Sequence, residues 1–118
     1  MPLQLKPLTD DFLTAPQLAP ADMAELARAG IRSVINNRPD YEAGPGQPTS
    51  AAIAQAAREA GLTYAFQPVL SHLITEQDVE RAAELIAALP KPIVAFCRSG
   101  ARSGKLYTAA QALKARRG

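Results

Sequence analysis

The chain has 118 residues, the length of a single domain, of which 47% are hydrophobic and 20% charged, so its composition excludes intrinsic disorder. Its 13 basic and 11 acidic side chains leave a formal net charge of +2, which argues against a protein dedicated to nucleic acid or to a membrane surface, because such proteins usually carry a clear basic excess. No apolar run approaches the ~20 residues of a membrane span, and the N-terminal segment lacks the apolar stretch of a signal peptide.

The first third of the chain predicts two extended pieces, a helix and a strand. Residues 3–8 form a short extended piece, and residues 12–15 are the first candidate strand of a sheet. Pro20 stands at the first position of a helix that Gly30 closes. Residues 31–36 follow as a strand with a β-branched pair at its centre.

The middle of the chain predicts a loop, a helix and a strand. Residues 37–48 are rich in proline and glycine and therefore form a loop. Residues 49–60 form an alanine-rich helix that Thr49 or Ser50 can cap and that a glycine ends. Residues 62–67 are the next strand.

A second loop, residues 68–74, precedes a strong helix signal. Thr75 and Asp78 have the spacing of a capping box, and apolar residues then recur at helical spacing until Pro90. Residues 93–96 are a continuous apolar run, typical of a central parallel strand that is buried on both faces.

The last loop, residues 97–101, leads into a last helix over residues 102–116. Strands and helices thus alternate, which predicts an α/β fold: a mainly parallel sheet flanked by helices, in one domain spanning residues 1–118, with the active loop between the last strand and the last helix. Right-handed crossovers bring the strand-to-helix loops to one edge, where ligands of such folds bind. The polar side chains expected at that edge are Asn36, Asn37, Arg38, Asp40, Ser71, His72, Cys97, Arg98, Ser99 and Arg102.

The segment CRSGARS, residues 97–103, carries the strongest chemical signal. Between a buried strand and a helix N-terminus, its backbone N–H groups can form an anion-binding nest. Gly100 permits a positive φ, and Arg102 adds a fixed charge with bidentate geometry. The same features favour a thiolate at Cys97, whereas the plainer interpretation is an inert buried cysteine. A nucleophile beside an anion cradle indicates covalent catalysis on a tetrahedral anion, with Cys97 and Arg102 as catalytic residues.

This segment resembles the active-site loop of rhodaneses and of cysteine phosphatases. Together with the segments DDFLTAPQL, SVINNRPD, GPGQP and AFCRSGARS, it makes the chain similar to a small bacterial family. That family is the phosphatase-like domain of beta-lactamase hydrolase-like proteins, whose members are often described as sulfur transferases. The resemblance covers residue 10 to about residue 103 and implies the fold of dual-specificity phosphatases.

The loop departs from the phosphatase pattern, Cys-x-x-Gly-x-x-Arg. Arg102 is five residues after Cys97 and Ser103 stands at the sixth position, which resembles the rhodanese spacing. Phe96 replaces the usual histidine, and the chain has no tryptophan for a Trp-Pro-Asp acid loop. Asp40 is the best substitute acid, or else a turn residue after proline. These departures favour sulfur transfer.

The leading hypothesis is therefore a rhodanese-type sulfurtransferase that takes sulfane sulfur from thiosulfate or a persulfide onto Cys97. Because the chain has no second cysteine, an external thiol, either glutathione or a partner protein, would accept the sulfur. The first alternative is a phosphatase that acts through a phosphocysteine, with Asp40 as the proton donor. The second is a non-catalytic module that binds a persulfide or an anion.

Other loop residues are candidates for substrate binding, and each has a plainer alternative. Arg98 can contact the substrate anion or lie in solvent. Ser99 can donate to the Cys97 sulfur, and Ser103 can do the same or cap the last helix. The remaining candidates for substrate contact are Gly100 and Ala101.

Further residues have expected supporting roles. Asn36 and Asn37 are expected to tie neighbouring loops together. Arg38 can pair with Asp40 or Glu42, or face the anion. His72, the single histidine, is either a surface residue or a member of the site.

One histidine and one cysteine argue against a metal site, and no cofactor is expected. The basic tip at Lys114, Arg116 and Arg117 suits the negative end of the last helix better than nucleic acid. A single thiol without an export signal fits a reducing cytoplasm. We therefore expect a cytoplasmic protein whose partners are small anions and thiols.

Overall fold

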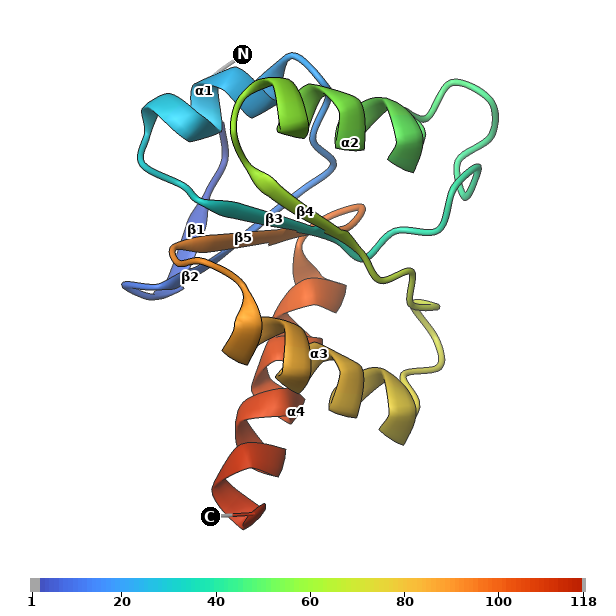
Figure 1. Ribbon diagram of the computed structural model, residues 1–118. Helices are drawn as coiled ribbons and strands as arrows, with labels where there is room; N and C mark the ends of the chain where they lie inside the picture. Colours follow the sequence, from blue (N-terminus) through green and yellow to red (C-terminus); the bar gives the residue numbers. More distant parts are fainter. Residues whose placement is uncertain (1–2, 118) are drawn as a thin grey trace.

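The computed structural model describes residues 3–117, and a five-stranded sheet runs through the middle of them (Figure 1). The strands are β1 (Lys6–Thr9), β2 (Phe12–Ala15), β3 (Ser33–Asn36), β4 (Thr63–Phe66) and β5 (Ile93–Phe96). Their order is β1-β2-β5-β3-β4, with β1 antiparallel to β2 and the other neighbours parallel. The predicted mainly parallel sheet is confirmed, and its central strand is β5.

Helices cover both faces of the sheet (Figure 1). One face carries α1 (Asp22–Arg28) and α2 (Ser50–Glu59), and the other carries α3 (Glu76–Ala88) and α4 (Ala101–Arg117). Val94 of β5 belongs to the buried cluster of α1 and α2, whereas its neighbours Ile93 and Ala95 belong to the cluster of α3. This alternation explains why the strand must be apolar throughout. Among residues 3–117, no helix combines the length and the apolar character needed to cross a bilayer.

The helix starts follow from local side-chain bonds. Thr49 caps α2, and Thr75 and Asp78 form the predicted capping box of α3. The first helix begins at Asp22, later than Pro20 predicts, because the Asp22 carboxylate accepts the N–H three residues before it and holds a turn there. These bonds fix where the helices begin, and therefore where the loops before them end.

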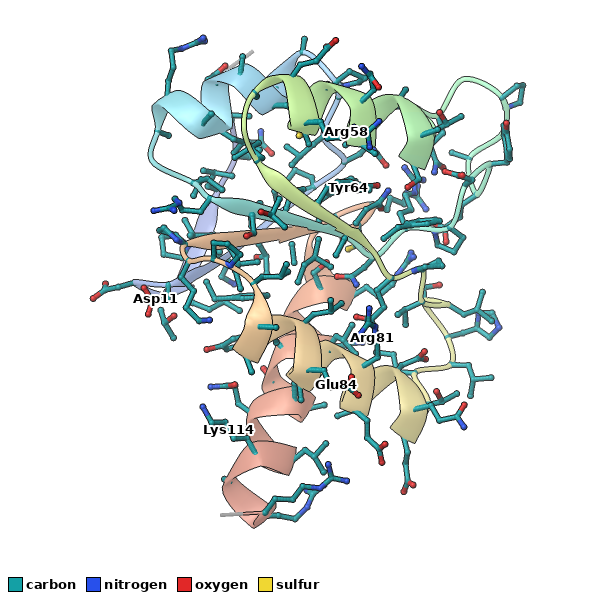
Figure 2. The ribbon with its side chains drawn as sticks, in the orientation of Figure 1. Asp11, Arg58, Tyr64, Arg81, Glu84 and Lys114 are labelled. Atoms are coloured by element: carbon teal, nitrogen blue, oxygen red, sulfur yellow. The ribbon has the colours of Figure 1, made fainter. Side chains whose placement is uncertain are left out.

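A tyrosine fastens the edge strand β4 to α2. Tyr64 points from β4 toward α2 (Figure 2), and its hydroxyl lies 2.6 Å from Oγ of Ser50. It also accepts from Nδ2 of Asn36 at 3.1 Å. Burial raises the pKa of the Tyr64 phenol, which therefore stays neutral near pH 7. The end of β3, the middle of β4 and the start of α2 are thus held together beside the loops that follow β3 and β4.

Candidate active site

A pocket of about 740 Å³ opens where β3, β4 and β5 end. It lies at the edge where the predicted topology brings the strand-to-helix loops together, and all three of those loops line it. The lining residues are Arg38, Glu42, Ala43, Leu70, Ser71, His72, Cys97, Arg98, Ser99, Ala101, Arg102 and Lys105.

Cys97 follows β5 directly, and only 1% of it is exposed. The N–H of Gly100 donates to its Sγ at 3.1 Å. Burial by itself raises the pKa of this thiol. Hydrogen bonds from the backbone and hydroxyl of Ser103 and from the N–H groups of Gly100 and Ser99 outweigh burial, so the pKa of Cys97 lies below its ordinary 9.0. The loop therefore favours the nucleophilic thiolate.

The cysteine loop is tied to the end of β2. The N–H of Cys97 donates to the carbonyl of Ala15 at 3.4 Å, and the N–H of Gln17 donates to the carbonyl of Arg98 at 3.2 Å. Gly100 has a φ of +95°, and a Cβ there would lie 3.4 Å from the backbone of Ala15. The positive φ therefore favours glycine, and a larger side chain at this position would start in contact with the Ala15 backbone.

Arg102 is 7% exposed, and its guanidinium offers five N–H donors in a rigid fork geometry. Nη1 and Nη2 donate to the two carboxylate oxygens of Glu42, each at 3.1 Å, and Nη1 also donates to the carbonyl of Val69 at 3.0 Å. Nε has no partner within residues 3–117. Buried N–H groups are almost always bonded, so the fork formed by Nε and the remaining Nη2 hydrogen lacks its acceptor, and an oxyanion has the geometry to supply one.

Glu42 joins two arginines. Its Oε1 also accepts from Nε of Arg38 at 2.9 Å, and Nη1 of Arg38 donates to Oε1 of Gln17 at 2.9 Å. Burial raises the pKa of Glu42, but the hydrogen bonds and charges of Arg102 and Arg38 outweigh it and hold that pKa below the ordinary 4.5. Of the alternatives for Arg38, the structure has the pairing with Glu42.

Asn37 connects the cysteine loop to the loop after β4. Oγ of Ser103 donates to Oδ1 of Asn37 at 2.8 Å, and Nδ2 of Asn37 donates to the carbonyl of Gln67 at 3.1 Å. A serine hydroxyl has one hydrogen, so Asn37 and the Cys97 sulfur compete for it. Ser103 is therefore shared between the nucleophile and the scaffold.

Asn36 and Asp40 do not line the pocket. Oδ1 of Asn36 accepts the N–H of Arg38 at 2.9 Å, so it shapes the turn after β3. Oδ1 of Asp40 accepts the N–H of Ser50 at 2.7 Å, where a carboxylate complements the start of α2. The loop after β3 thus brings the carboxylate of Asp40 to the start of α2.

The remaining predicted residues are near the entrance. Arg98, Ser99 and His72 are exposed and line the pocket. The hydroxyl of Ser99 accepts the N–H of Ala101 at 3.3 Å, so it braces the start of α4, while its own N–H is the group that bonds the Cys97 sulfur.

The sequence did not single out Glu42 as part of the site. Glu42 lies 60 residues from Arg102 along the chain, and nothing local in a proline- and glycine-rich loop indicates that its carboxylate reaches so far. Lys105 was also missed, since it reads as one more exposed residue of the last helix. Within residues 3–117, no group of three or more metal-ligating side chains could hold an ion.

Comparison with known proteins finds matches along almost the whole chain. Residues 4–114 match the family described as "Beta-lactamase hydrolase-like protein, phosphatase-like domain". A beta-lactamase hydrolase-like protein from Xylella fastidiosa is 38% identical over 111 residues, which are 94% of this chain and 23% of that protein. The chain therefore spans about a quarter of the length of this curated relative.

Solved structures share the fold. A candidate phosphatase from Neisseria meningitidis superimposes with a TM-score of 0.80 at 38% identity, over 86% of this chain and 72% of that one. TpbA from P. aeruginosa, solved in complex with pTyr, gives a TM-score of 0.61 at 12% identity, over 83% of this chain and 55% of that one, a likeness of fold alone. The predicted cysteine-phosphatase-like fold is confirmed.

Proposed function

The chain belongs to the family of phosphatase-like domains of beta-lactamase hydrolase-like proteins, and on that premise we propose that it is a phosphatase with Cys97 as nucleophile and Arg102 as anion ligand. One observation carries the proposal: a buried arginine with an unpaired Nε lines the same pocket as a cysteine whose pKa is lowered. The candidate phosphatase at 38% identity supports phosphate-ester hydrolysis ahead of sulfur transfer, the function that the sequence favoured.

The first step is attack of the Cys97 thiolate on phosphorus. A P–S bond forms, the ester P–O bond breaks, and its electron pair leaves with the alcohol oxygen. The N–H groups of the loop and the free fork of Arg102 stabilise the charge on the phosphoryl oxygens. Asp40 is bonded to Ser50, and Glu42 is held as a carboxylate, so neither supplies a proton to the leaving group. The enzyme should therefore prefer esters of acidic alcohols, such as nitrophenol.

The second step regenerates the enzyme. Water attacks phosphorus, an O–P bond forms and the P–S bond breaks, so inorganic phosphate and the thiolate are released and a proton goes to solvent. The Ser103 hydroxyl can turn from Asn37 to the departing sulfur, because it reaches both.

The test is hydrolysis of p-nitrophenyl phosphate by the wild type and by Cys97→Ser, with Thr108→Ala on α4 as a control away from the pocket. Release of nitrophenol should be lost in Cys97→Ser and kept in the control. Acid quench during turnover should trap a phosphorylated protein, detected by intact mass, in the wild type and in the control but not in Cys97→Ser. Equal turnover by the wild type and Cys97→Ser would exclude this mechanism.

Sulfur transfer is a second candidate, because Arg102 is five residues after Cys97 rather than six. The thiolate would attack the outer sulfur of thiosulfate, forming one S–S bond and breaking another as sulfite leaves. An external thiol, glutathione or a protein, would then take the sulfur. This route needs no proton donor for the leaving group, which fits the place of Asp40.

Intact mass after incubation with thiosulfate distinguishes sulfur transfer from phosphate-ester hydrolysis. A gain of one sulfur atom that is lost on addition of glutathione, and is absent in Cys97→Ser, would favour sulfur transfer. An adduct that glutathione does not remove would instead favour the non-catalytic binding module.

A further inference from the structure

Large hydrophobic side chains that are exposed lie at one edge of the described residues. Tyr41 is 63% exposed, Phe66 42%, Leu70 48% and Leu73 56%, and all four belong to β4 or to the two loops that follow β3 and β4. A scattered exposed leucine needs no explanation, but a group of them beside a pocket indicates a contact surface. Three of them, Tyr41, Leu70 and Leu73, are called the collar below. Leu70 lines the pocket, and Tyr41 and Leu73 each adjoin a lining residue in the chain, Glu42 and His72 respectively.

Two of the collar residues, Tyr41 and Leu70, are next in the chain to the residues that bond Arg102. Its guanidinium is held by the carboxylate of Glu42 and by the carbonyl of Val69. The residues next in the chain are Tyr41 on one side and Leu70 on the other. Leu70 lines the pocket and forms a bridge with Leu73, whose N–H donates to the Leu70 carbonyl at 3.3 Å. An anion bound on the free fork of Arg102 would therefore have the apolar side chain of Leu70 in the wall of its pocket, with Leu73 beside it.

The backbone at Tyr41 gives an independent reason to assign it a role. Its φ is +62°, in the left-handed region that a bulky residue rarely adopts. Asparagine or glycine would adopt this conformation more easily. A tyrosine that is both strained and exposed contributes little to the core, so its ring is better explained by a ligand than by folding.

On the basis of the proposed function, we propose that the collar selects the substrate: the phosphate must carry an apolar group, as aryl phosphates do, rather than a polyol or no organic group at all. Inorganic phosphate would reach the loop N–H groups and Arg102 but leave the collar exposed. An aromatic ester would bury part of the collar on binding, and that burial supplies the discrimination.

Calorimetric binding of two phosphonates tests this without turnover, since neither can be hydrolysed. Phenylphosphonate should bind the wild type about tenfold more tightly than methylphosphonate, the factor expected for partial burial of a ring. The double variant Leu70→Ser/Leu73→Ser should reduce that ratio to below about threefold, while Leu70→Met/Leu73→Met, which keeps the apolar surface, should retain it.

Tyr41→Asn separates recognition from folding. It should lower the phenyl-to-methyl ratio while leaving the Tm unchanged or raised, because asparagine relieves the strained φ. Equal affinities of the wild type for both phosphonates would overturn the collar while leaving the anion site intact. Binding of neither would overturn the anion site and the proposed function with it. A wild-type dimer that the serine variant makes monomeric, with an unchanged ratio, would identify the collar as a self-association surface instead.

Discussion

Two hollows of similar size differ in how they hold their charges. The pocket at Cys97 has a volume of about 740 Å³, and a groove bounded by the β1–β2 turn, α3 and α4 has about 810 Å³. Asp11 and Lys114, which line the groove, are labelled in Figure 2. The groove has the ion pair of Arg117 with Glu80, whose side chains are 63% and 49% exposed, whereas Arg102 in the pocket is 7% exposed.

Volume therefore does not distinguish a reactive site from a surface groove. Water solvates Arg117 whether or not Glu80 is present, and such pairs contribute little. Arg102 has exchanged water for Glu42 and Val69, and its Nε still lacks a partner among the described residues. Interaction with an incoming anion is stronger where water no longer competes.

The largest effect we expect is the loss of activity on Arg102→Lys in the pocket, compared with the matched change in the groove. Lysine is a point charge that cannot hold Glu42 with two donors and an anion with two more, so kcat/KM for p-nitrophenyl phosphate should fall by about 100- to 1,000-fold. The matched change in the groove, Arg117→Lys, should leave kcat/KM within twofold, which steady-state kinetics can check. A similar loss in both variants would remove the contrast.

Glu42→Gln should have the next largest effect. The amide keeps the shape but lacks the charge that holds Arg102 and Arg38, so kcat/KM should fall by about tenfold. Because the folded pKa of Glu42 is lowered, its carboxylate stabilises the fold above pH 4.5, and that stability is lost as the pH falls through the lowered pKa. The difference in Tm between the wild type and Glu42→Gln should thus shrink on acidification. A difference independent of pH would show that the charge does not matter.

Ser103→Ala should raise the pKa of the Cys97 nucleophile without removing the other groups that bind the anion. It removes the hydroxyl donor but leaves the backbone donors, so the pKa of Cys97 should rise toward its ordinary 9.0 while the protein stays folded. The rate of alkylation by iodoacetamide against pH measures this, and Ser103→Thr should restore the wild-type midpoint. An unmoved midpoint in the alanine variant would assign the lowered pKa to the backbone alone.

Asp40→Ala should have the smallest effect. It removes the acceptor for the Ser50 N–H at the start of α2, at a cost of about 1 kcal/mol in unfolding free energy. Turnover of p-nitrophenyl phosphate and of poorer leaving groups should stay within twofold of the wild type. A steep loss confined to poor leaving groups would return Asp40 to the role of general acid.

The helices and strands, and the sheet edge where three strand-to-helix loops converge, could be predicted from the sequence, because they depend on local patterns. The apolar run of β5, the capping box of α3 and the alternation of strands and helices together imply one edge for three loops. The position of Cys97 follows from that edge.

The partners within the site could not be predicted. Whether the carboxylate of residue 40 or of residue 42 faces Arg102 depends on the path of a loop with many prolines and glycines. Asp40 turns to the Ser50 N–H, and Glu42 crosses to Arg102. Two acidic residues two positions apart thus have unrelated tasks, and only the three-dimensional course of the loop separates them.

The sharing of one carboxylate by two guanidinium groups affects how phosphate binding depends on ionic strength. Arg38 and Arg102 carry two positive charges and Glu42 one negative charge, so the trio keeps a single positive charge with its acid in place. Both arginines are nearly buried, and mobile ions screen such charges far less than surface charges. The pocket should therefore retain phosphate at ionic strengths that would strip it from an exposed basic patch.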